Sequence, residues 1–297
     1  MKLQFTKMHA LGNDFIVIDN RKLKLKNLSL LSKKLCHRKF GVGADQLLAL
    51  YNSKKAGFKM RIFNPDGGEA EMCGNGIRCL GKYVWEKHVR GQGSGVRGQE
   101  LSIETLSGII HLEGKGGLIK VDMGEPVFEP EKIPVKTRQE LTPLNSPLDK
   151  EGYRGVYDEI INYPLQVDDR KFKITCISMG NPHAVIVVND VASFPVSLYG
   201  PVIEKHCMFP KKTNVEIIQV LNRKNIKMRV WERGAGETMA CGTGASASAV
   251  ASALLGLSDR KVTVYLLGGK LVIEWAKNNH VYMTGPAVEV FEGEIEV

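Results

Sequence analysis

An internal duplication constrains the fold of this chain more than any other feature of its sequence. Residues 60–63 (MRIF) recur as residues 228–231 (MRVW), and the string Cys-Gly-x-Gly that begins at Cys73 begins again at Cys241. The offset is 168 residues in both cases, and under it fourteen positions between residues 12 and 76 are identical. A period this long is typical of two similar domains, each from one half of the chain, and not of a solenoid.

The offset changes beyond the repeated cysteine string. Met123 matches Met283 at an offset of 160. The eight residues that the first half has in excess fit residues 91–98, a glycine-rich stretch typical of a loop. Residues 137–163, between the two copies, carry several prolines and glycines with little periodicity, so we interpret them as a surface excursion or linker.

Each half repeats one order of elements: a strand, a helix with apolar residues at helical spacing, a second strand, a second helix after the cysteine, and several short strands. The predicted strands are 14–18, 59–63, 101–104, 109–112 and 118–123 in the first half, and 184–188, 227–231, 262–266, 270–274 and 281–283 in the second. The predicted helices begin near Leu28 and Asn75, and near Val196 and Ala245.

This order predicts an α+β fold of two pseudo-symmetric domains, each a curved, mostly antiparallel sheet wrapped around a central helix. We predict residues 1–122 with 287–297 for the first domain and 123–286 for the second. The last residues of the chain then return to complete the first domain.

The composition is that of an ordinary globular protein. The chain has 297 residues, of which 43% are hydrophobic and 25% charged, which excludes disordered and fibrous classes. The longest unbroken apolar run, residues 184–188, is far shorter than the roughly 20 residues of a membrane span. The first residues lack the features of a secretory signal, so we expect a cytoplasmic location and no membrane partner.

An excess of positive charge raises the question of a nucleic-acid partner. The formal net charge is +9, but the basic residues are spread along the chain, with denser stretches at 21–26, 33–39 and 211–212. No stacking aromatic residues are interleaved with them, so we interpret the charge as solvated surface and expect no nucleic acid to bind. A nucleic-acid-binding module is the non-enzyme alternative, which a failure to shift DNA or RNA would dismiss.

Six cysteines are scattered along the chain without the paired CxxC spacing of a structural zinc site, so we expect free thiols and no metal. Cys73 and Cys241 are the pair that matches under the duplication, and both lie in glycine-flanked turns. We interpret the remaining four as small buried packing residues. They are Cys36, Cys79, Cys176 and Cys207.

Both repeated cysteines are predicted to lie where a turn enters a helix. The first N–H groups of a helix have no partner within it, and the positive end of its dipole attracts anions. The same position lowers the pKa of a thiol. Each half therefore offers an anion cradle beside a potential base. The cradle residues are Gly74, Asn75, Gly242 and Thr243.

A pair of equivalent thiols suits inversion at a carbon centre. One thiolate removes a proton from one face of the carbon, and one thiol returns a proton to the other face. Two helix N-termini that converge on one carboxylate stabilise the charge that develops on the substrate. The duplication therefore favours two-base epimerase or racemase chemistry.

At these residues the chain closely resembles diaminopimelate epimerases. The strings that carry the resemblance follow the order of that family and span nearly the whole chain. They are residues 9–15 (HALGNDF), 63–67 (FNPDG), 72–79 (MCGNGIRC), 180–183 (GNPH), 232–237 (ERGAGE) and 240–244 (ACGTG).

The resemblance implies an isomerase that works without a cofactor, pyridoxal phosphate included, and interconverts LL- and meso-diaminopimelate for lysine and peptidoglycan synthesis. It places the active site in the cleft between two domains and suggests a homodimer. Cys73 and Cys241 match the family's catalytic pair, and His183 and Glu232 match positions that adjust the cysteine pKa values. The substrate-contacting positions implied are Asn13, Gln46, Asn64, Gly74, Asn75, Asn181, Asn214, Glu232, Arg233, Gly242 and Thr243.

These residue types suit the implied substrate, which carries two ammonium and two carboxylate groups. Amide oxygens and a carboxylate accept from ammonium, whereas amide N–H groups or a guanidinium donate to carboxylate. Arg233 can bind the distal carboxylate through two N–H groups.

Structural roles for the same residues stay open at this point. Asn13 and Asn181 follow glycines, and asparagine tolerates the left-handed geometry of such turns. Glu232 and Arg233 can form an ordinary surface pair, and His183 can be a structural histidine. The duplication and the family pattern together favour function.

Two other enzyme classes share parts of this pattern. Proline racemase-like epimerases share the architecture and the paired thiols, but a proline pocket does not need a polar set for a second amino-acid head group. A dinucleotide-binding oxidoreductase is suggested by Gly91-x-Gly93 and Gly234-x-Gly236, although neither follows the strand, turn and helix order of that motif. The polar set is Asn64, Asn181, Asn214 and Arg233.

Overall fold

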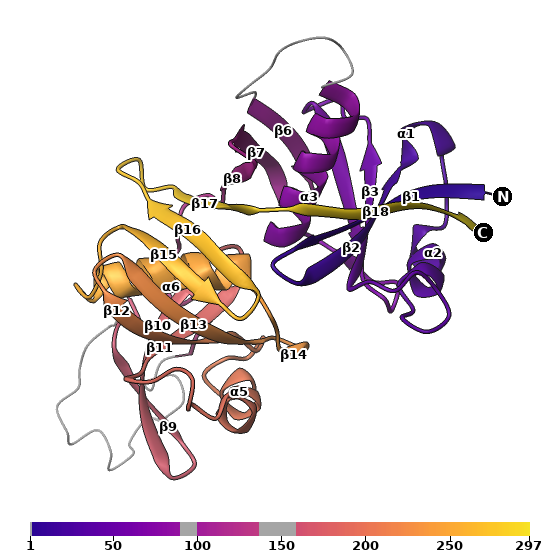
Figure 1. The fold of residues 1–297 in the computed structure, drawn as a ribbon. Helices are drawn as coiled ribbons and strands as arrows, with labels where there is room; N and C mark the ends of the chain where they lie inside the picture. The colour runs from indigo at the N-terminus through magenta and orange to yellow at the C-terminus, as the bar shows by residue number, and fades with distance from the viewer. Residues whose placement is uncertain (1, 90–99, 137–158) are drawn as a thin grey trace. The chain divides into compact units, whose positions relative to one another are not determined.

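The computed structural model describes residues 2–89, 100–136 and 159–297 (Figure 1). They form two compact units, Met1–Met123 with Tyr282–Val297, and Gly124–Val281. The sequence predicts that the chain returns to the first domain at residue 287, but it returns earlier. Strand β17 (Val281–Pro286) pairs antiparallel with β8 (Leu118–Asp122), which brings Tyr282 into the first unit.

The first unit is one curved sheet with helices on both faces. From one edge, β18 pairs with β1, and the sheet continues through β2, β3, β4, β6, β7 and β8 to β17. The β2–β3 and β4–β6 pairs are parallel, and the others are antiparallel. The remaining elements are β1 (Lys2–Ala10), β2 (Asn13–Asp19), α1 (Asn20–Leu23), α2 (Leu28–Leu35), β3 (Gln46–Tyr51), β4 (Phe58–Phe63), β5 (Glu69–Ala70), α3 (Gly74–Val84), the π-helical turn η1 (Trp85–Val89), β6 (Glu100–Thr105), β7 (Gly108–Lys115) and β18 (Val288–Glu296).

The second unit repeats this topology. Its sheet runs from β9 through β10, β11, β12, β13 and β15 to β16, and the β11–β12 and β13–β15 pairs are again parallel. Strands β1 and β10 are related by the offset of 168 at both ends, so the repeat extends beyond its sequence identities. The elements are β9 (Tyr163–Val167), β10 (Arg170–Ser178), β11 (Pro182–Val187), α5 (Val196–Glu204), β12 (Asn214–Asn222), β13 (Asn225–Glu232), β14 (Gly236–Glu237), α6 (Gly242–Leu254), β15 (Lys261–Leu266) and β16 (Gly269–Trp275).

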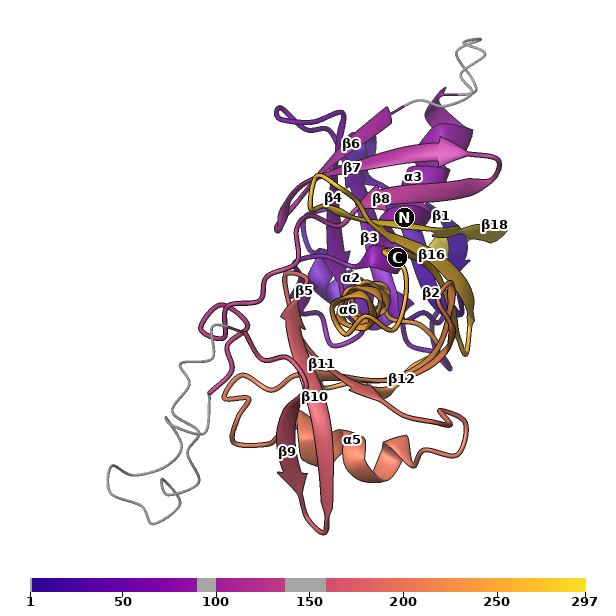
Figure 2. The ribbon, with the colours of Figure 1, turned by 90° about the vertical axis from the view of Figure 1, so that its left-hand side faces the viewer.

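A central helix fills the concave face of each sheet. Helix α6 is seen end-on in Figure 2 with β11, β12 and β16 around it, and its alanines and serines from Ala245 to Ser252 are buried. Helix α3 packs in the same way on strands β1, β2, β3, β7, β8 and β18. A Cβ atom at Gly76 would lie 3.2 Å from Leu48 and 3.3 Å from Phe15, so a side chain there would crowd the sheet. The predicted α+β fold of curved, mostly antiparallel sheets around central helices is confirmed.

The shorter helices α2 and α5 cover the opposite faces. In β2, Ile16 and Ile18 pack with Leu28 and Leu35 of α2, whereas Phe15, one position out of step, faces α3. In the second unit Val196, Tyr199 and Ile203 of α5 join the equivalent core cluster. Strand β2 and its equivalent in the second unit, β11, are therefore buried on two faces. This burial explains their nearly continuous apolar sequences.

Two predictions need correction. The predicted linker, residues 137–163, is not wholly a surface segment, because Ile160 and Tyr163 are buried in the core of the second unit. Residues 137–158 and the predicted insertion at 91–98 lie outside the described residues. Among the cysteines, Cys36, Cys79 and Cys176 are buried as expected, but Cys207 is exposed in the segment that follows α5.

Within the described ranges, every helix is too short or too polar to cross a membrane.

Candidate active site

Each repeated cysteine is the N-cap residue of a central helix. Cys73 precedes α3 with φ −142° and ψ 114°, and Cys241 precedes α6 with φ −121° and ψ 115°. The N–H of Gly76 donates to Cys73 Sγ over 3.4 Å, and the N–H of Gly244 donates to Cys241 Sγ over 3.4 Å. The predicted position at the entry of a helix is confirmed for both thiols. This hydrogen bond and the helix dipole favour a thiolate.

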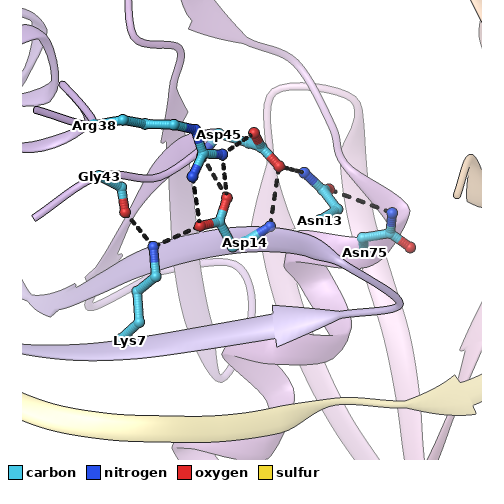
Figure 3. Close-up of polar contacts among 7 residues, drawn as sticks. All are labelled: Lys7, Asn13, Asp14, Arg38, Gly43, Asp45 and Asn75. Atoms are coloured by element: carbon cyan, nitrogen blue, oxygen red, sulfur yellow. Dashed lines mark hydrogen bonds and ion pairs between the residues drawn. The ribbon is translucent and has the colours of Figure 1, made fainter. Parts of the chain in front are cut away.

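Two asparagines lie beside Cys73 in the first unit. The Cys73 thiol donates to Asn13 Oδ1 over 3.7 Å. Asn75 Nδ2 donates to the same oxygen over 3.3 Å, as Figure 3 shows. Asn13 is the first residue of β2, and Asn75 lies in the first turn of α3. The fold therefore brings these three predicted site residues together.

Gln46 and Asn64 form a second amide pair in the first unit. Gln46 Nε2 donates to Asn64 Oδ1 over 2.8 Å. Gln46 begins β3, which runs parallel to β2, so it lies at the same edge of the sheet as Asn13. Gln46 Oε1 is buried and has no hydrogen-bond partner within the described part of the chain.

A buried histidine and glutamate lie beneath the corresponding edge of the second unit. His183 Nδ1 lies 2.7 Å from Glu216 Oε1, and His183 Nε2 lies 2.9 Å from Asn181 Oδ1. The side chains of His183 and Glu216 are both 0% exposed. A Cβ atom at Gly244 would lie 2.6 Å from Glu216 Oε1, so this carboxylate reaches the first turn of α6. His183 is therefore linked to the helix that Cys241 caps.

The Cys241 thiol is 6% exposed, and both its burial and two nearby carboxylates oppose its ionisation. Burial raises the pKa of its thiol well above the usual value, Glu232 and Glu216 raise this pKa further, and hydrogen bonds with Thr243 and the Gly244 N–H act in the opposite direction. Burial likewise raises the pKa of Glu232, although hydrogen bonds from Thr238 and the Cys241 thiol lower it in part. Thr238 Oγ1 donates to Glu232 Oε1 over 2.5 Å.

Asn214 and Arg233 are held largely by backbone groups. Asn214 Nδ2 donates to the Pro182 carbonyl over 2.8 Å, and the Arg233 N–H donates to Asn214 Oδ1 over 2.9 Å. The Arg233 guanidinium donates to the Lys211 carbonyl over 3.3 Å in an exposed position. Asn214 thus fixes the turn that presents Arg233, a structural role that the sequence prediction does not include.

The sequence prediction misses Glu216, Thr238 and Arg78. A signal for Glu216 exists, because the offset of 168 sets this carboxylate against Leu48 in an otherwise apolar strand. Arg78 is 0% exposed in α3, where the equivalent residue of α6 is Ser246. Both departures from the repeat mark polar groups beside a cysteine-capped helix.

Two other site types find little support. Among the described residues, no group of three or more His, Cys, Asp or Glu side chains is placed to hold a metal ion. Gly234 lies in the turn between the antiparallel strands β13 and β14, and Gly236 is the first residue of β14. A dinucleotide motif requires such glycines between a strand and a helix.

Comparison with solved structures identifies the fold. A phenazine biosynthesis protein of the PhzF family from Bacillus anthracis matches with a TM-score of 0.68 and 18% identity, covering 100% of each chain. A hydroxyproline epimerase from Agrobacterium vitis, solved with bound trans-4-hydroxy-L-proline, matches with a TM-score of 0.67 and 11% identity, covering 99% of this chain and 92% of its own. At these identities the likeness concerns the fold alone.

Sequence comparison identifies the family. The family model described as "Diaminopimelate epimerase" matches residues 5–129 and 175–290. The diaminopimelate epimerase of Acetivibrio thermocellus is 50% identical over 301 residues, covering 99% of each chain. That of Moorella thermoacetica is 50% identical over 299 residues, covering 98% of this chain and 99% of its own. The chain belongs to the diaminopimelate epimerase family.

Proposed function

We propose that this protein interconverts LL- and meso-2,6-diaminopimelate by inverting one α-carbon, with Cys73 and Cys241 as the two proton-transfer groups. The observation that carries the proposal is the pair of equivalent N-caps, in which each thiol accepts an N–H of the helix it precedes. The substrate is inferred from relatives about half identical to this chain over nearly its full length, which carry that name.

The proposed reaction moves one proton off the substrate and one onto it. A thiolate takes the proton from the α-carbon and becomes a thiol, while the electron pair of the C–H bond spreads into the neighbouring carboxylate. The other thiol then protonates the opposite face of the carbon and becomes a thiolate. The two cysteines exchange protonation states in each turnover, so the reverse reaction uses the same groups in the opposite order.

The proposal requires both thiols to reach one α-carbon, as the sequence predicts for a site between the two domains. The first-turn N–H groups at Gly74, Asn75, Gly242 and Thr243 would stabilise the charge that develops on the reacting carboxylate. Amides and Arg233 would bind the distal amino-acid head group. The amides in this role are Asn13, Gln46, Asn64, Asn181 and Asn214.

The second unit contains the groups that would tune the proton transfer. Glu232 and Glu216 disfavour a thiolate at Cys241, which suits this residue to hold the proton that it returns to the substrate. His183 is hydrogen-bonded to Glu216 and Asn181 and would keep the Glu216 carboxylate in place. We therefore assign pKa-adjusting roles to His183 and Glu232, and add Glu216.

The test is proton exchange at carbon. In heavy water and without added cofactor, LL-diaminopimelate should equilibrate with the meso form and gain deuterium at one α-carbon. Cys73→Ala and Cys241→Ala should each lose epimerisation by about 100-fold to 10,000-fold, the range expected of a general acid or base. Full activity in either variant, with thiol content checked by mass, contradicts the mechanism.

A parallel reaction with proline tests the substrate. Inversion of proline at a rate comparable to that of diaminopimelate would favour a proline racemase-like enzyme. The proposal also includes a role in lysine and peptidoglycan precursor synthesis, a cytoplasmic location and a homodimer. Light scattering during size-exclusion chromatography tests the last of these, since a mass near that of one 32.9 kDa chain would contradict it.

A further inference from the structure

The direction of two side-chain amides beside Cys73 can be determined from their partners. An asparagine amide has an oxygen that accepts and a nitrogen that donates, and the two ends have nearly the same shape. A donor-only or acceptor-only neighbour is therefore needed to fix which end points where. Asn75 and Asn13 each have such a neighbour.

Arg78 fixes the amide of Asn75. Its guanidinium donates through Nη2 to Asn75 Oδ1 over 2.8 Å. A guanidinium has no acceptor, so the Asn75 oxygen must face it and the Asn75 nitrogen must face Asn13. Burial lowers the pKa of Arg78 to about 10, which leaves the group charged and donor-only at neutral pH.

Arg78 is itself held firmly within the first unit. Its Nη1 donates to the Gly74 carbonyl over 3.1 Å, and its Nε donates to the Pro286 carbonyl over 3.3 Å. The residue is 0% exposed. Its position is thus set by the start of α3 and by the end of β17, and not by a mobile surface contact.

Asp45 fixes the amide of Asn13. Asn13 Nδ2 donates to Asp45 Oδ2 over 2.8 Å (Figure 3). An ionised carboxylate only accepts, so the Asn13 nitrogen must face Asp45 and the Asn13 oxygen must face Asn75 and the Cys73 thiol. The two amides therefore form a directed chain from Arg78 through Asn75 and Asn13 to Asp45.

Arg38 anchors the carboxylate end of this chain. Arg38 Nη2 donates to Asp45 Oδ1 over 2.6 Å and to Asp14 Oδ1 over 2.8 Å, and Lys7 Nζ donates to Asp14 Oδ2 over 2.7 Å (Figure 3). Burial raises the pKa of Asp14, but hydrogen bonds from Arg38 and Lys7 outweigh it and hold that pKa well below the usual range. Two carboxylates and two cations thus form an ion-pair network.

We propose that Asp45, anchored by Arg38, and Arg78 are positioning residues that turn the Asn13 amide so that its oxygen, and not its N–H, faces the Cys73 thiol. The inference rests on the proposed function in taking Cys73 as a reacting group. An amide oxygen accepts from a thiol but cannot donate to a thiolate, so this direction favours the protonated form of Cys73. It opposes the Gly76 N–H and the helix dipole, which favour the thiolate.

Several charged or titratable groups bear on Cys73 in the first unit. Arg78 and Cys79 of α3 interact with it electrostatically. Lys7 of β1, Asp14 of β2, and Arg38 and Asp45 before β3 form the network described above. A test must therefore separate the turning of the amide from a simple change of charge nearby.

The test compares Asp45→Asn with Asp14→Asn. Each variant removes one of the two carboxylates to which Arg38 donates. Of these two carboxylates, the Asn13 amide donates to that of Asp45. In Asp45→Asn, Arg38 still donates to the side-chain oxygen at position 45, so the new N–H faces Asn13. That contact favours turning the Asn13 N–H toward Cys73, against the opposing contact of Asn13 with the Asn75 N–H. The rate of Cys73 alkylation by iodoacetamide is followed against pH, with the Cys73 peptide quantified by mass spectrometry and folding checked by thermal unfolding.

We expect the midpoint of Cys73 alkylation to fall by about one pH unit in Asp45→Asn, a tenfold gain in rate below the midpoint, and much less in Asp14→Asn. Equal shifts in the two variants, no shift, or a rise in Asp45→Asn would overturn the proposal. If Asp45→Asn does not fold, Asp45→Thr replaces it, since threonine stands at the equivalent position 213. Alkylation needs no substrate, so the result holds whether or not diaminopimelate is turned over.

Discussion

The two halves of this molecule share a backbone plan but surround their cysteines with different chemistry. In the first unit Phe15 and Leu48 pack beneath the start of α3. At the equivalent positions the second unit carries His183 and Glu216, joined over 2.7 Å beneath the start of α6. Conversely, the first unit has Arg78 where the second has Ser246.

The two copies of the duplicated unit thus share the position of the thiol but differ in the charges around it. A cationic side chain lies buried in the helix that Cys73 caps, whereas carboxylates lie beside Cys241. A two-base reaction needs one thiolate and one thiol at the start of each turnover. The opposite nearby charges make the two thiols unequal in how readily they ionise. The first-turn N–H groups that each helix offers to an anion remain the same.

The largest effect is expected when the second unit is given the apolar pair of the first. Glu216→Leu or His183→Phe alone leaves a buried polar partner behind and should cost about 3–5 kcal/mol of unfolding free energy. The double variant should recover most of that loss, because both partners become apolar. Urea unfolding of the two single variants and the double variant gives the coupling energy.

The matched control is the ion pair of Lys261 and Glu274, which is exposed on β15 and β16. Its single replacements should each cost about 0–1 kcal/mol. If the losses of His183→Phe and Glu216→Leu simply add in the double variant, the two side chains do not act as a buried pair. All variants at 183 and 216 should also epimerise more slowly than the parent protein.

The fold could be predicted from the sequence wherever the repeat or the periodicity was informative. Helices α2, α3, α5 and α6 follow from apolar spacing and from the turns at Cys73 and Cys241. Strand β3, by contrast, is a short apolar run (QLLALY) that periodicity alone cannot distinguish from a buried helix. The return to the first unit at Tyr282 depends on pairing between β17 and β8, a long-range contact with no local signal.

The site was predictable in its residues but not in its hydrogen bonds. Asn13, Asn75 and Cys73 were identified by motif, and their contacts follow from the junction of β2 with α3. Asp45 and Arg38 carry no such signal, since an acidic and a basic residue in a surface segment are usually solvated. From the sequence alone the basic stretch at 33–39 is interpreted as solvated surface, yet its Arg38 anchors Asp45 and Asp14. Charge pairing across the chain cannot be derived from composition.

A second, smaller effect sharpens the contrast between the thiols. Because Glu232 raises the pKa of Cys241, Glu232→Gln should lower that pKa and raise the thiolate fraction at pH 8, about tenfold for each unit of change. Iodoacetamide alkylation of the Cys241 peptide measures it. In the parent protein the rate should still be rising above pH 9, since a thiol below its pKa gains thiolate with each increment of pH.

Glu237→Gln provides the control for this experiment. Glu237 belongs to the same unit, but its carboxylate is paired with Arg229. The alkylation rate of Cys241 should therefore hardly change in this variant. Equal rates for Glu232→Gln and the parent protein would mean that burial alone protects Cys241.

The smallest expected effect concerns an ion pair that both halves retain. Arg61 binds Glu69 through Nε and Nη2, each over 2.7 Å, and Arg229 binds Glu237 through the same atoms over 2.7 Å and 3.1 Å. Only their surroundings differ. Arg229 Nη1 also donates to three backbone carbonyls, those of Val191, Ala192 and Phe194.

Arg61→Ala should therefore cost about 0–1 kcal/mol, as expected of a partly exposed pair, and Arg229→Ala about 1–3 kcal/mol, because backbone carbonyls also lose a charged donor. Denaturant unfolding of both variants at the same pH and salt measures the difference. Raising the salt concentration should weaken the Arg61 pair more, since its side chain is 36% exposed against 20% for Arg229. Equal losses in the two variants would mean that the carbonyl contacts contribute nothing, and that the halves differ only around their thiols.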